Sequence, residues 1–324
     1  MQLTLQPNIQ PLSQPIRYTD KVLLIGSCFT EHMSGRLEQH KFRVLQNPHG
    51  ILFNPHSVVR SLKQYIEGIQ VTEDELFFLH ETWNSWDHHS HFSGTGKAAV
   101  ASNINKEMET ARDFIRQAQW VIITLGSSYQ YYLREGNRPV ANNHRAPAQW
   151  FDRRLLGIDE ITGSLKQVLE QLRLVNPEVN VLFTVSPVRH IRDGVVENNR
   201  SKARLIESVH ALCDQLPYCH YFPAYELIID ILRDYRFYDV DFVHPNYLAT
   251  SYVWEQFIKA CIDPEAVPVM EQVKDIMTAK AHRPRFPDTD NHRKFLERYA
   301  EKTHQLMAVY PYLDLNEELS YFNS

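Results

Sequence analysis

Two short segments, far apart in the sequence, carry residue types suited to nucleophilic catalysis. The first is Gly26-Ser27-Cys28, which directly follows an apolar run at residues 22–25. A serine or cysteine nucleophile needs a base that removes its proton. The second segment offers that base, because Asp241 and His244 stand three residues apart, and a carboxylate that holds imidazole Nδ1–H leaves Nε2 free to accept a proton. Together they indicate acyl-transfer chemistry.

Each segment also has a structural interpretation. Gly26 can shape an ordinary strand-to-helix turn with Ser27 as the N-cap, and Asp241 can cap a surface loop. The more specific feature is the order, with a nucleophile at the first strand-to-helix turn and Asp-x-x-His before a late helix. Open α/β folds bind ligands at the carboxyl ends of parallel strands, where a helix N-terminus offers free N–H groups.

The composition is that of a packed globular protein. The chain has 324 residues, 43% hydrophobic and 23% charged, with a net charge of −5. This charge gives no electrostatic case for nucleic acid or an anionic membrane as partner. No apolar run reaches the roughly 20 residues that span a bilayer, and the first residues do not resemble a signal peptide. The four cysteines are scattered, so we expect reduced thiols, a cytoplasmic location, and no metal or cofactor.

Apolar runs alternate with amphipathic segments along most of the chain. This alternation predicts an α/β fold, a three-layer α/β/α sandwich with a mostly parallel central sheet. We expect strands at 22–25, 42–45, 120–125, 179–185 and 218–222, and helices at 29–40, from 57, 105–117, 158–174, 201–216, 224–235 and 247–262. Prolines 264 and 268 then mark a break. We therefore expect an α/β domain at 1–262 and a helical C-terminal extension at 263–324 that packs on it.

Several segments outside the two motifs support a family resemblance. They are GSCF at 26–29, NPHGILFNP at 47–55, LGSSYQYY at 125–132, VANNHR at 140–145, SPVRHIRDGVVENNRSKA at 186–203, PAYELIIDILRDYRFY at 223–238 and DFVHP at 241–245. With them the chain resembles the GSCFA family over roughly residues 20–262, and that family resembles the SGNH (GDSL-type) hydrolase superfamily. The resemblance implies that Ser27 is the nucleophile, His244 its base and Asp241 the group that orients the imidazole.

The same resemblance implies an oxyanion hole. Its donors would be the backbone N–H of Ser27 or Cys28 and that of Gly50. The third donor in the superfamily is normally an asparagine after the next core strand, where this chain has Gly126-Ser127-Ser128. Ser127 is one substitute.

The loop that follows offers two more candidates for the third donor, Asn142 and Asn143. We favour Asn143, which stands beside His144 in a turn-rich stretch. The thiol of Cys28 is an alternative nucleophile. The resemblance favours Ser27, with Cys28 turned toward the core.

Other polar groups are candidates for substrate binding. Asp87, His88, His89 and His91 crowd one segment, but adjacent histidines rarely converge on one ion, so we expect a loop lining the cleft rather than a metal site. In it, His89 or Ser90 would contact substrate, and Trp83 and Trp86 would stack on a sugar ring.

Ser127 is a further candidate, together with Arg189 and His190. These last two follow the third predicted core strand and would meet an anionic or polyhydroxyl substrate. A helix-capping or surface pair is the alternative for them.

Three functions fit these residues. The first is an esterase that removes acyl groups from a carbohydrate or a related small ester through a Ser27 acyl-enzyme. The second is an acyltransferase with the same triad, in which a sugar hydroxyl replaces water. The third is a catalytically inactive carbohydrate-binding protein on the same fold, which the missing asparagine favours. The sequence leaves the oligomeric state open.

Overall fold

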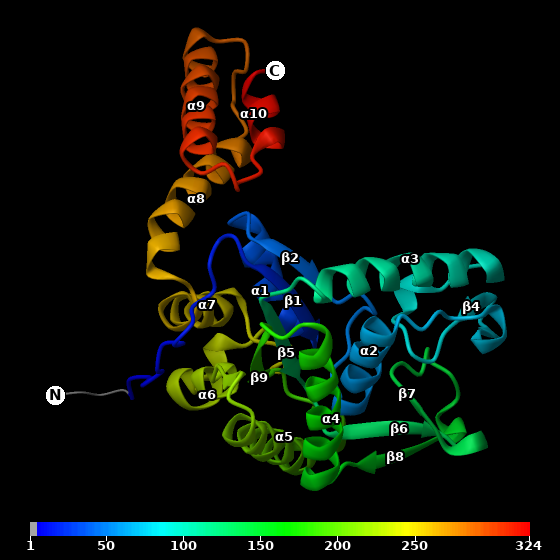
Figure 1. The fold of residues 1–324 in the computed structure, drawn as a ribbon. Coiled ribbons are helices and arrows are strands. Elements are labelled where there is room, and N and C mark those ends of the chain that lie inside the picture. Colours follow the sequence, from blue (N-terminus) through cyan, green and yellow to red (C-terminus); the bar gives the residue numbers. More distant parts are fainter. Residues whose placement is uncertain (1–4) are drawn as a thin grey trace.

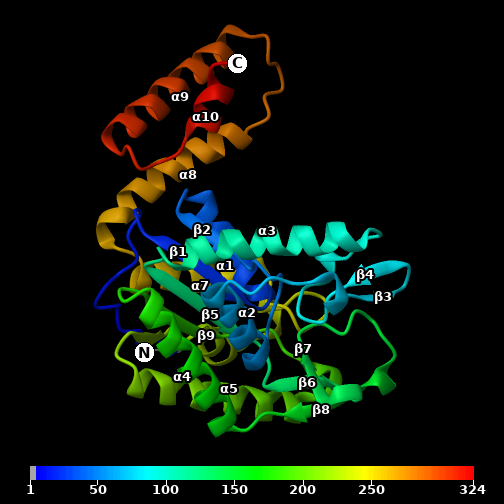
Figure 2. The same ribbon diagram turned by 45° about the vertical axis from the view of Figure 1, so that its right-hand side comes forward.

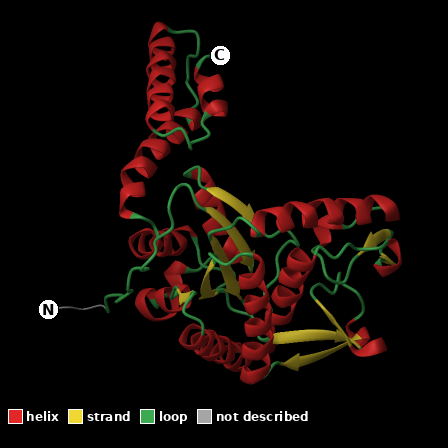
Figure 3. Ribbon diagram, in the orientation of Figure 1, coloured by secondary structure: helices red, strands yellow, loops and turns green. Residues whose placement is uncertain are grey.

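The computed structural model describes residues 5–324, apart from the side chain of Asp193. At its centre lies a sheet of five parallel strands in the order β10-β9-β5-β1-β2, with helices on both faces (Figures 1 and 3). The strands are β1 (Lys21–Gly26), β2 (Arg43–Gln46), β5 (Trp120–Leu125), β9 (Asn180–Val185) and β10 (Cys219–Tyr221). The predicted α/β sandwich with a parallel sheet is confirmed.

Each central strand contributes alternate side chains to two hydrophobic cores. Leu23 pairs in register with Val121, which pairs with Val181, and all three lie in one core. Val22 and Leu24 lie in the other. Since side chains along a strand alternate between faces, a sheet covered on both sides must be apolar throughout. Four helices cover the first core: α2 (Pro55–Glu67), α3 (Lys97–Ile115), α4 (Ile158–Val175) and α5 (Val195–Gln215). The second core is covered by α1 (Cys28–Gln39), α6 (Ala224–Glu226) and α7 (Tyr247–Cys261), among others.

Two helices begin earlier than the sequence predicts. Helix α3 begins at Lys97 rather than at residue 105, and α5 begins at Val195 rather than at residue 201. Both follow a glycine and have no side-chain N-cap. The usual polar start signal is therefore missing from the sequence at these two positions.

Two small antiparallel sheets, which the sequence did not indicate, extend from the α/β body (Figure 1). One pairs β3 (Phe77–Leu79) with β4 (Thr82–Asn84), and the other places β6 (Tyr129–Leu133) between β7 (Arg138–Val140) and β8 (Phe151–Leu155). Strand β6 follows the carboxyl end of β5 after residues 126–128. Strands of three to five residues are too short to show a clear alternation of apolar and polar positions.

The C-terminal segment is helical. It contains α8 (Val267–Ala281), α9 (Asp290–Val309) and α10 (Asn316–Phe322), and the α9–α10 pair projects away from the body (Figures 1 and 2). Glu318 is buried and pairs with Lys41 of the body at 2.9 Å and with Lys280 of α8 at 3.0 Å. The boundary at residue 262 stays a prediction. Of the helices in the described part of the chain, none is long and apolar enough to cross a membrane.

Candidate active site

Ser27 lies at the turn between β1 and α1. Gly26 has φ +154°, and a Cβ on it would lie 2.4 Å from Thr124 O, so the turn requires glycine. Ser27 is the N-cap of α1, and its Oγ accepts a hydrogen bond from Phe29 N at 3.3 Å. Its side chain is 3% exposed. The capping interpretation is thus confirmed, and it places the hydroxyl at the positive end of a helix.

The thiol beside it is a poorer nucleophile at neutral pH. Burial, with a smaller contribution from Glu31, raises the pKa of Cys28, so the thiol stays protonated. The backbone N–H of Cys28, at the first position of α1, has no carbonyl acceptor among the described residues and interacts only with the thiol of its own residue. Cys28 is therefore better placed as an oxyanion donor than as the attacking group.

The other two expected backbone donors already have acceptors. Ser27 N donates to Thr124 O at 3.2 Å, and Gly50 N donates to Asn47 O at 2.6 Å. Gly50 has φ +80°, and a Cβ there would lie 2.1 Å from the Cβ of His89. Gly50 is thus required by the close packing of its loop, whether or not its N–H meets substrate.

Asp241 and His244 form the expected pair. Asp241 Oδ2 lies 2.6 Å from His244 Nδ1, while Oδ1 accepts from Val243 N at 2.8 Å and His244 N at 3.0 Å. These hydrogen bonds lower the pKa of Asp241 to about 2. One carboxylate therefore fixes both the loop and the imidazole, and it leaves Nε2 as the free ring nitrogen.

The loop that carries this pair is joined to the segment after β9. Arg189 N donates to Val243 O at 3.2 Å. Burial lowers the pKa of His32 in α1 and of His190, and the charge of His244 adds a smaller lowering in each case. No hydrogen bond joins Ser27 to His244 among the described residues. Such bonds are often open in the absence of substrate and form in the Michaelis complex.

A cavity of about 360 Å³ gathers four of the predicted site residues. His89, Ser127, Asn143 and His190 all line it. The backbone of this wall reaches the nucleophile turn, because Leu52 N donates to Gly26 O at 3.0 Å, between the lining residues at 51 and 53. Ser27, Asp241 and His244 do not line this cavity themselves.

Asn143 and Ser127 differ in whether they have a free group that could donate a hydrogen bond to an oxyanion. Ser127 N donates to Phe53 O at 3.0 Å, and Ser127 Oγ accepts from Tyr129 N at 3.2 Å. The side-chain amide of Asn143 makes no hydrogen bond to any part of the chain that the structure describes, whereas Asn142 Oδ1 accepts from His144 N. Asn143 is therefore the better candidate for the third donor.

The side chain of Arg189 does not line the cavity. Its guanidinium lies over the rings of Tyr238 and Tyr235, at 4.5 and 5.6 Å from their centres. His190 instead lines the cavity, and it packs against Gly126, where a Cβ would be 3.2 Å from its Nε2.

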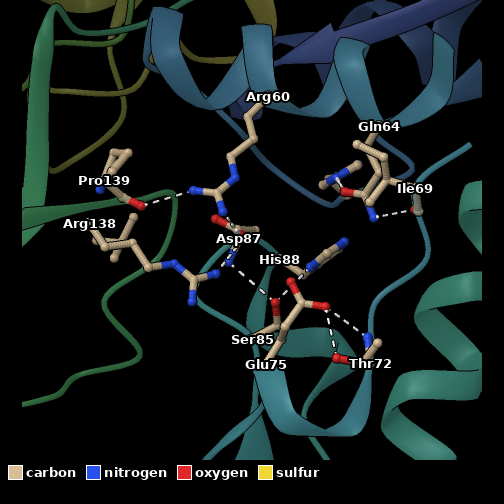
Figure 4. Close-up of polar contacts among 12 residues, drawn as sticks. Arg60, Gln64, Ile69, Thr72, Glu75, Ser85, Asp87, His88, Arg138 and Pro139 are labelled. Atoms are coloured by element: carbon tan, nitrogen blue, oxygen red, sulfur yellow. Dashed lines mark hydrogen bonds and ion pairs between the residues drawn. The ribbon is translucent and has the colours of Figure 1, made fainter. Parts of the chain in front are cut away.

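The segment rich in aspartate and histidine is a structural network. Asp87, whose side chain is 13% exposed, accepts from Arg60 of α2 at 2.9 Å and from Arg138 of β7 at 2.8 Å (Figure 4). His88 stacks on His49 with ring centres 4.4 Å apart.

Trp86 and Phe77 of the same segment pack beside that network. Trp86 stacks on Phe77 and is only 7% exposed, so it belongs to the core and does not present a face to a sugar. In the described chain, no three histidine, cysteine, aspartate or glutamate side chains lie close enough together to hold a metal ion.

The sequence analysis missed one buried polar face on α5. Asn198 Oδ1 accepts from His190 N at 2.8 Å, Ser201 Oγ accepts from Ser128 N at 2.8 Å, and Lys202 Nζ donates to two backbone carbonyls. All three side chains are at most 4% exposed. Residues at spacing i, i+3 and i+4 share one helix face. The sequence analysis placed the helix start at residue 201, so Asn198 fell outside the predicted helix and the shared face could not be recognised.

The fold and these loops define an α/β protein with a helix-capping serine after β1, an Asp–His pair in the loop before α7, and a cavity lined by residues that follow β2, β5 and β9. The model of the GSCFA family matches residues 21–257, and the model of the GSCFA domain protein, C-terminal domain, matches residues 273–324. The chain belongs to the GSCFA family.

Two further comparisons add little. Among curated proteins, no relative matches. Among solved structures, an acetyl xylan esterase (Est2A) from the rumen bacterium Butyrivibrio proteoclasticus aligns with a TM-score of 0.38 and 10% identity, over 76% of this chain and 64% of that chain.

Proposed function

We propose that this protein is a serine hydrolase of the SGNH type that cleaves an ester through a Ser27 acyl-enzyme. The observation that carries the proposal is the 2.6 Å contact between Asp241 Oδ2 and His244 Nδ1. It leaves Nε2 as the free ring nitrogen, which a general base needs. The nucleophile on the other side is a helix-capping hydroxyl with the Cys28 N–H beside it.

The steps follow from these atoms. Ser27 Oγ attacks the ester carbonyl carbon while His244 Nε2 takes the hydroxyl proton, and the Asp241 carboxylate stabilises the imidazolium. The Cys28 N–H and the Asn143 amide donate to the oxyanion, and each such donor is worth roughly 3 to 4 kcal/mol of barrier. His244 then protonates the departing alcohol, and water releases the acyl group by the reverse sequence. A rotation of the Ser27 or His244 side chain must bring the two together first.

The cavity supports a polyhydroxyl alcohol as the leaving group. Its wall combines the Asn142 and Asn143 amides with the rings of Tyr129 and Tyr131. Amides and hydroxyls bind sugar hydroxyls, and aromatic faces bind the apolar face of a sugar ring. We therefore favour an O-acyl carbohydrate over a simple alkyl ester. Transfer of the same acyl group to a sugar hydroxyl instead of water would need no change in the triad.

A non-catalytic carbohydrate-binding protein is the second candidate. It is favoured by the open Ser27–His244 pair and by the two backbone donors that already have acceptors. The two functions differ in whether Ser27 is activated.

Active-site labelling separates them. Wild-type protein, Ser27→Ala, Cys28→Ala and His244→Ala would be treated with a fluorophosphonate and analysed by intact-mass and peptide mass spectrometry. We expect one adduct on Ser27, kept in Cys28→Ala and lost in the other two variants. An adduct on Cys28 would make the thiol the nucleophile. No adduct, together with retained binding of acylated oligosaccharides, would support the binding protein.

A further inference from the structure

Lys202 is a buried lysine at the edge of the sheet where the candidate site lies. It comes from the third turn of α5, and it is 1% exposed. Its Nζ donates to Gly126 O at 2.7 Å and to Ser186 O at 2.6 Å. These carbonyls follow β5 and β9 directly, so one ammonium group joins the carboxyl ends of two neighbouring strands.

This ammonium has no carboxylate partner among the described residues. The titratable groups that face it are Cys28 of α1, His190 after β9 and Tyr225, whose ring centre is 5.9 Å away. Burial lowers the pKa of Lys202 to about 7, and the Cys28 thiol acts against that shift. A buried cation without an ion-pair partner is costly to the fold. Such a cost is more often tolerated where the charge serves a site.

Hydrogen bonds connect the Lys202 ammonium to the nucleophile turn through the end of β5. Ser27 N donates to Thr124 O at 3.2 Å, and Thr124 stands two residues before Gly126, whose carbonyl accepts from Lys202 Nζ at 2.7 Å. The same residue, Gly126, also donates its backbone N–H to Phe53 O at 2.7 Å. Phe53 lines the cavity. Ser201, next to Lys202, binds Ser128 N. The same turn of α5 therefore holds the loop after β5 and carries the cation.

We propose that Lys202 is a positioning residue for the Ser27 site, which holds the carboxyl ends of β5 and β9 in place and favours negative charge at the Ser27–Cys28 turn. The catalytic part rests on the proposed hydrolase function, whereas the effect on Cys28 does not. In the reaction, the negative charge in question is the oxyanion bound next to the Cys28 N–H. While Lys202 is protonated, below its pKa of about 7, its positive charge in a water-poor site lowers the energy of that oxyanion without reorganisation.

The test compares Lys202→Met, which keeps the length and removes the charge, with Lys202→Arg, which keeps the charge. Lys166→Met is the control, because Lys166 is a partly exposed lysine that, among the described residues, donates one hydrogen bond, to Gln215 Oε1. Two rates would be measured by peptide mass spectrometry between pH 6 and 9: phosphonylation of Ser27 by a fluorophosphonate and alkylation of Cys28 by iodoacetamide.

We expect Lys202→Met to slow the phosphonylation of Ser27 by about tenfold or more, less than the loss of a direct oxyanion donor. Alkylation of Cys28 should slow several-fold as well, because the thiolate loses a nearby cation. Lys202→Arg should recover most of both rates, and Lys166→Met should match wild type. A folded Lys202→Met protein with both rates within twofold of wild type would overturn the proposal.

The two readouts keep the proposals apart. If wild-type Ser27 is not labelled at all, the hydrolase function fails, and the Cys28 rate alone decides the role of the Lys202 charge. If Lys202→Met does not fold, the pH profiles of Cys28 alkylation in Lys202→Arg and wild type test the role of the Lys202 charge instead. Wild type should lose part of its Cys28 reactivity relative to Lys202→Arg above pH 7, where lysine releases its proton and arginine does not. Identical profiles would overturn the proposal.

Discussion

The nucleophile turn and the Asp241–His244 loop lie at opposite extremes of burial within one candidate site. Ser27 is 3% exposed, at a turn whose backbone bonds to β5 and to the loop after β2. The His244 and Asp241 side chains are 46% and 45% exposed. Their loop is held by its own carboxylate, by the backbone bonds of Asp239 N to His244 O and of Asn246 N to Phe237 O, and by one backbone bond to Arg189.

This difference indicates how the site is organised. The buried half is preorganised, because its groups cannot move without breaking hydrogen bonds in the core. The exposed half is adjustable, and we expect it to move more than the buried half when the Ser27–His244 hydrogen bond forms. Mutations in the exposed half should therefore affect activity without affecting stability, and mutations in the buried half should affect stability first.

The largest effect is expected in the exposed half. His244→Ala should lower kcat by roughly 10⁴- to 10⁶-fold, because it removes the proposed general base for Ser27. The melting temperature should not change, since the ring makes no contact in the core. Steady-state hydrolysis and a thermal melt would be measured beside His304→Ala, which removes another exposed histidine. A loss of activity that comes with a lower melting temperature would contradict the division into two halves.

Asp241→Asn tests the same loop more finely. An amide that binds the imidazole in the wrong tautomer should lower kcat by about 10⁴-fold. The measurement is kcat over pH 5 to 9, with Asp239→Asn, in the same loop, as control. A loss below tenfold would show that the carboxylate shapes the loop without serving the imidazole.

Much of this arrangement was predictable, because it depends on patterns that are local in sequence. The apolar runs at 22–25 and 120–125 predicted buried parallel strands, and a glycine followed by serine predicted the capped turn. Asp241 and His244 are three residues apart, so their contact depends only on one short loop. A resemblance that covered most of the chain set the order of these parts.

The features that were missed depend on long-range packing. Asn198 and Lys202 became recognisable as one polar helix face only once α5 was known to begin at Val195. Trp86 was expected to stack on sugar, but a short strand that no pattern indicated brings Phe77 against it. Side chains that bridge distant loops leave no periodic signal in the sequence, because their partners are backbone atoms.

In the buried half, acid should destabilise the fold through His49. Burial lowers the pKa of His49 to about 4, against about 6.5 in an unfolded chain. Between these values the unfolded state binds more protons, so the free energy of unfolding falls as the pH drops from 6.5 to 4, by up to about 1.4 kcal/mol per pH unit. Urea unfolding at pH 7 and pH 5 would measure this loss. His49→Asn should reduce it, and His304→Asn should not; equal losses in both variants would place the acid-sensitive group elsewhere.

The smallest effect concerns the hydrogen bonds of α5. Ser201→Ala leaves the buried Ser128 N–H without its 2.8 Å acceptor, so the free energy of unfolding should fall by about 1 to 3 kcal/mol. Ser164→Ala in α4 is the matched control, because that hydroxyl only donates to Ile161 O of its own helix, and its loss should cost less than about 0.5 kcal/mol. Denaturant unfolding and KM for an acyl ester would be measured on both. Ser201→Ala should also raise KM, because the loop that carries Ser127 into the cavity loses an anchor. If both variants lose the same stability and KM does not move, the polar face of α5 is ordinary helix packing, and the buried half is rigid for other reasons.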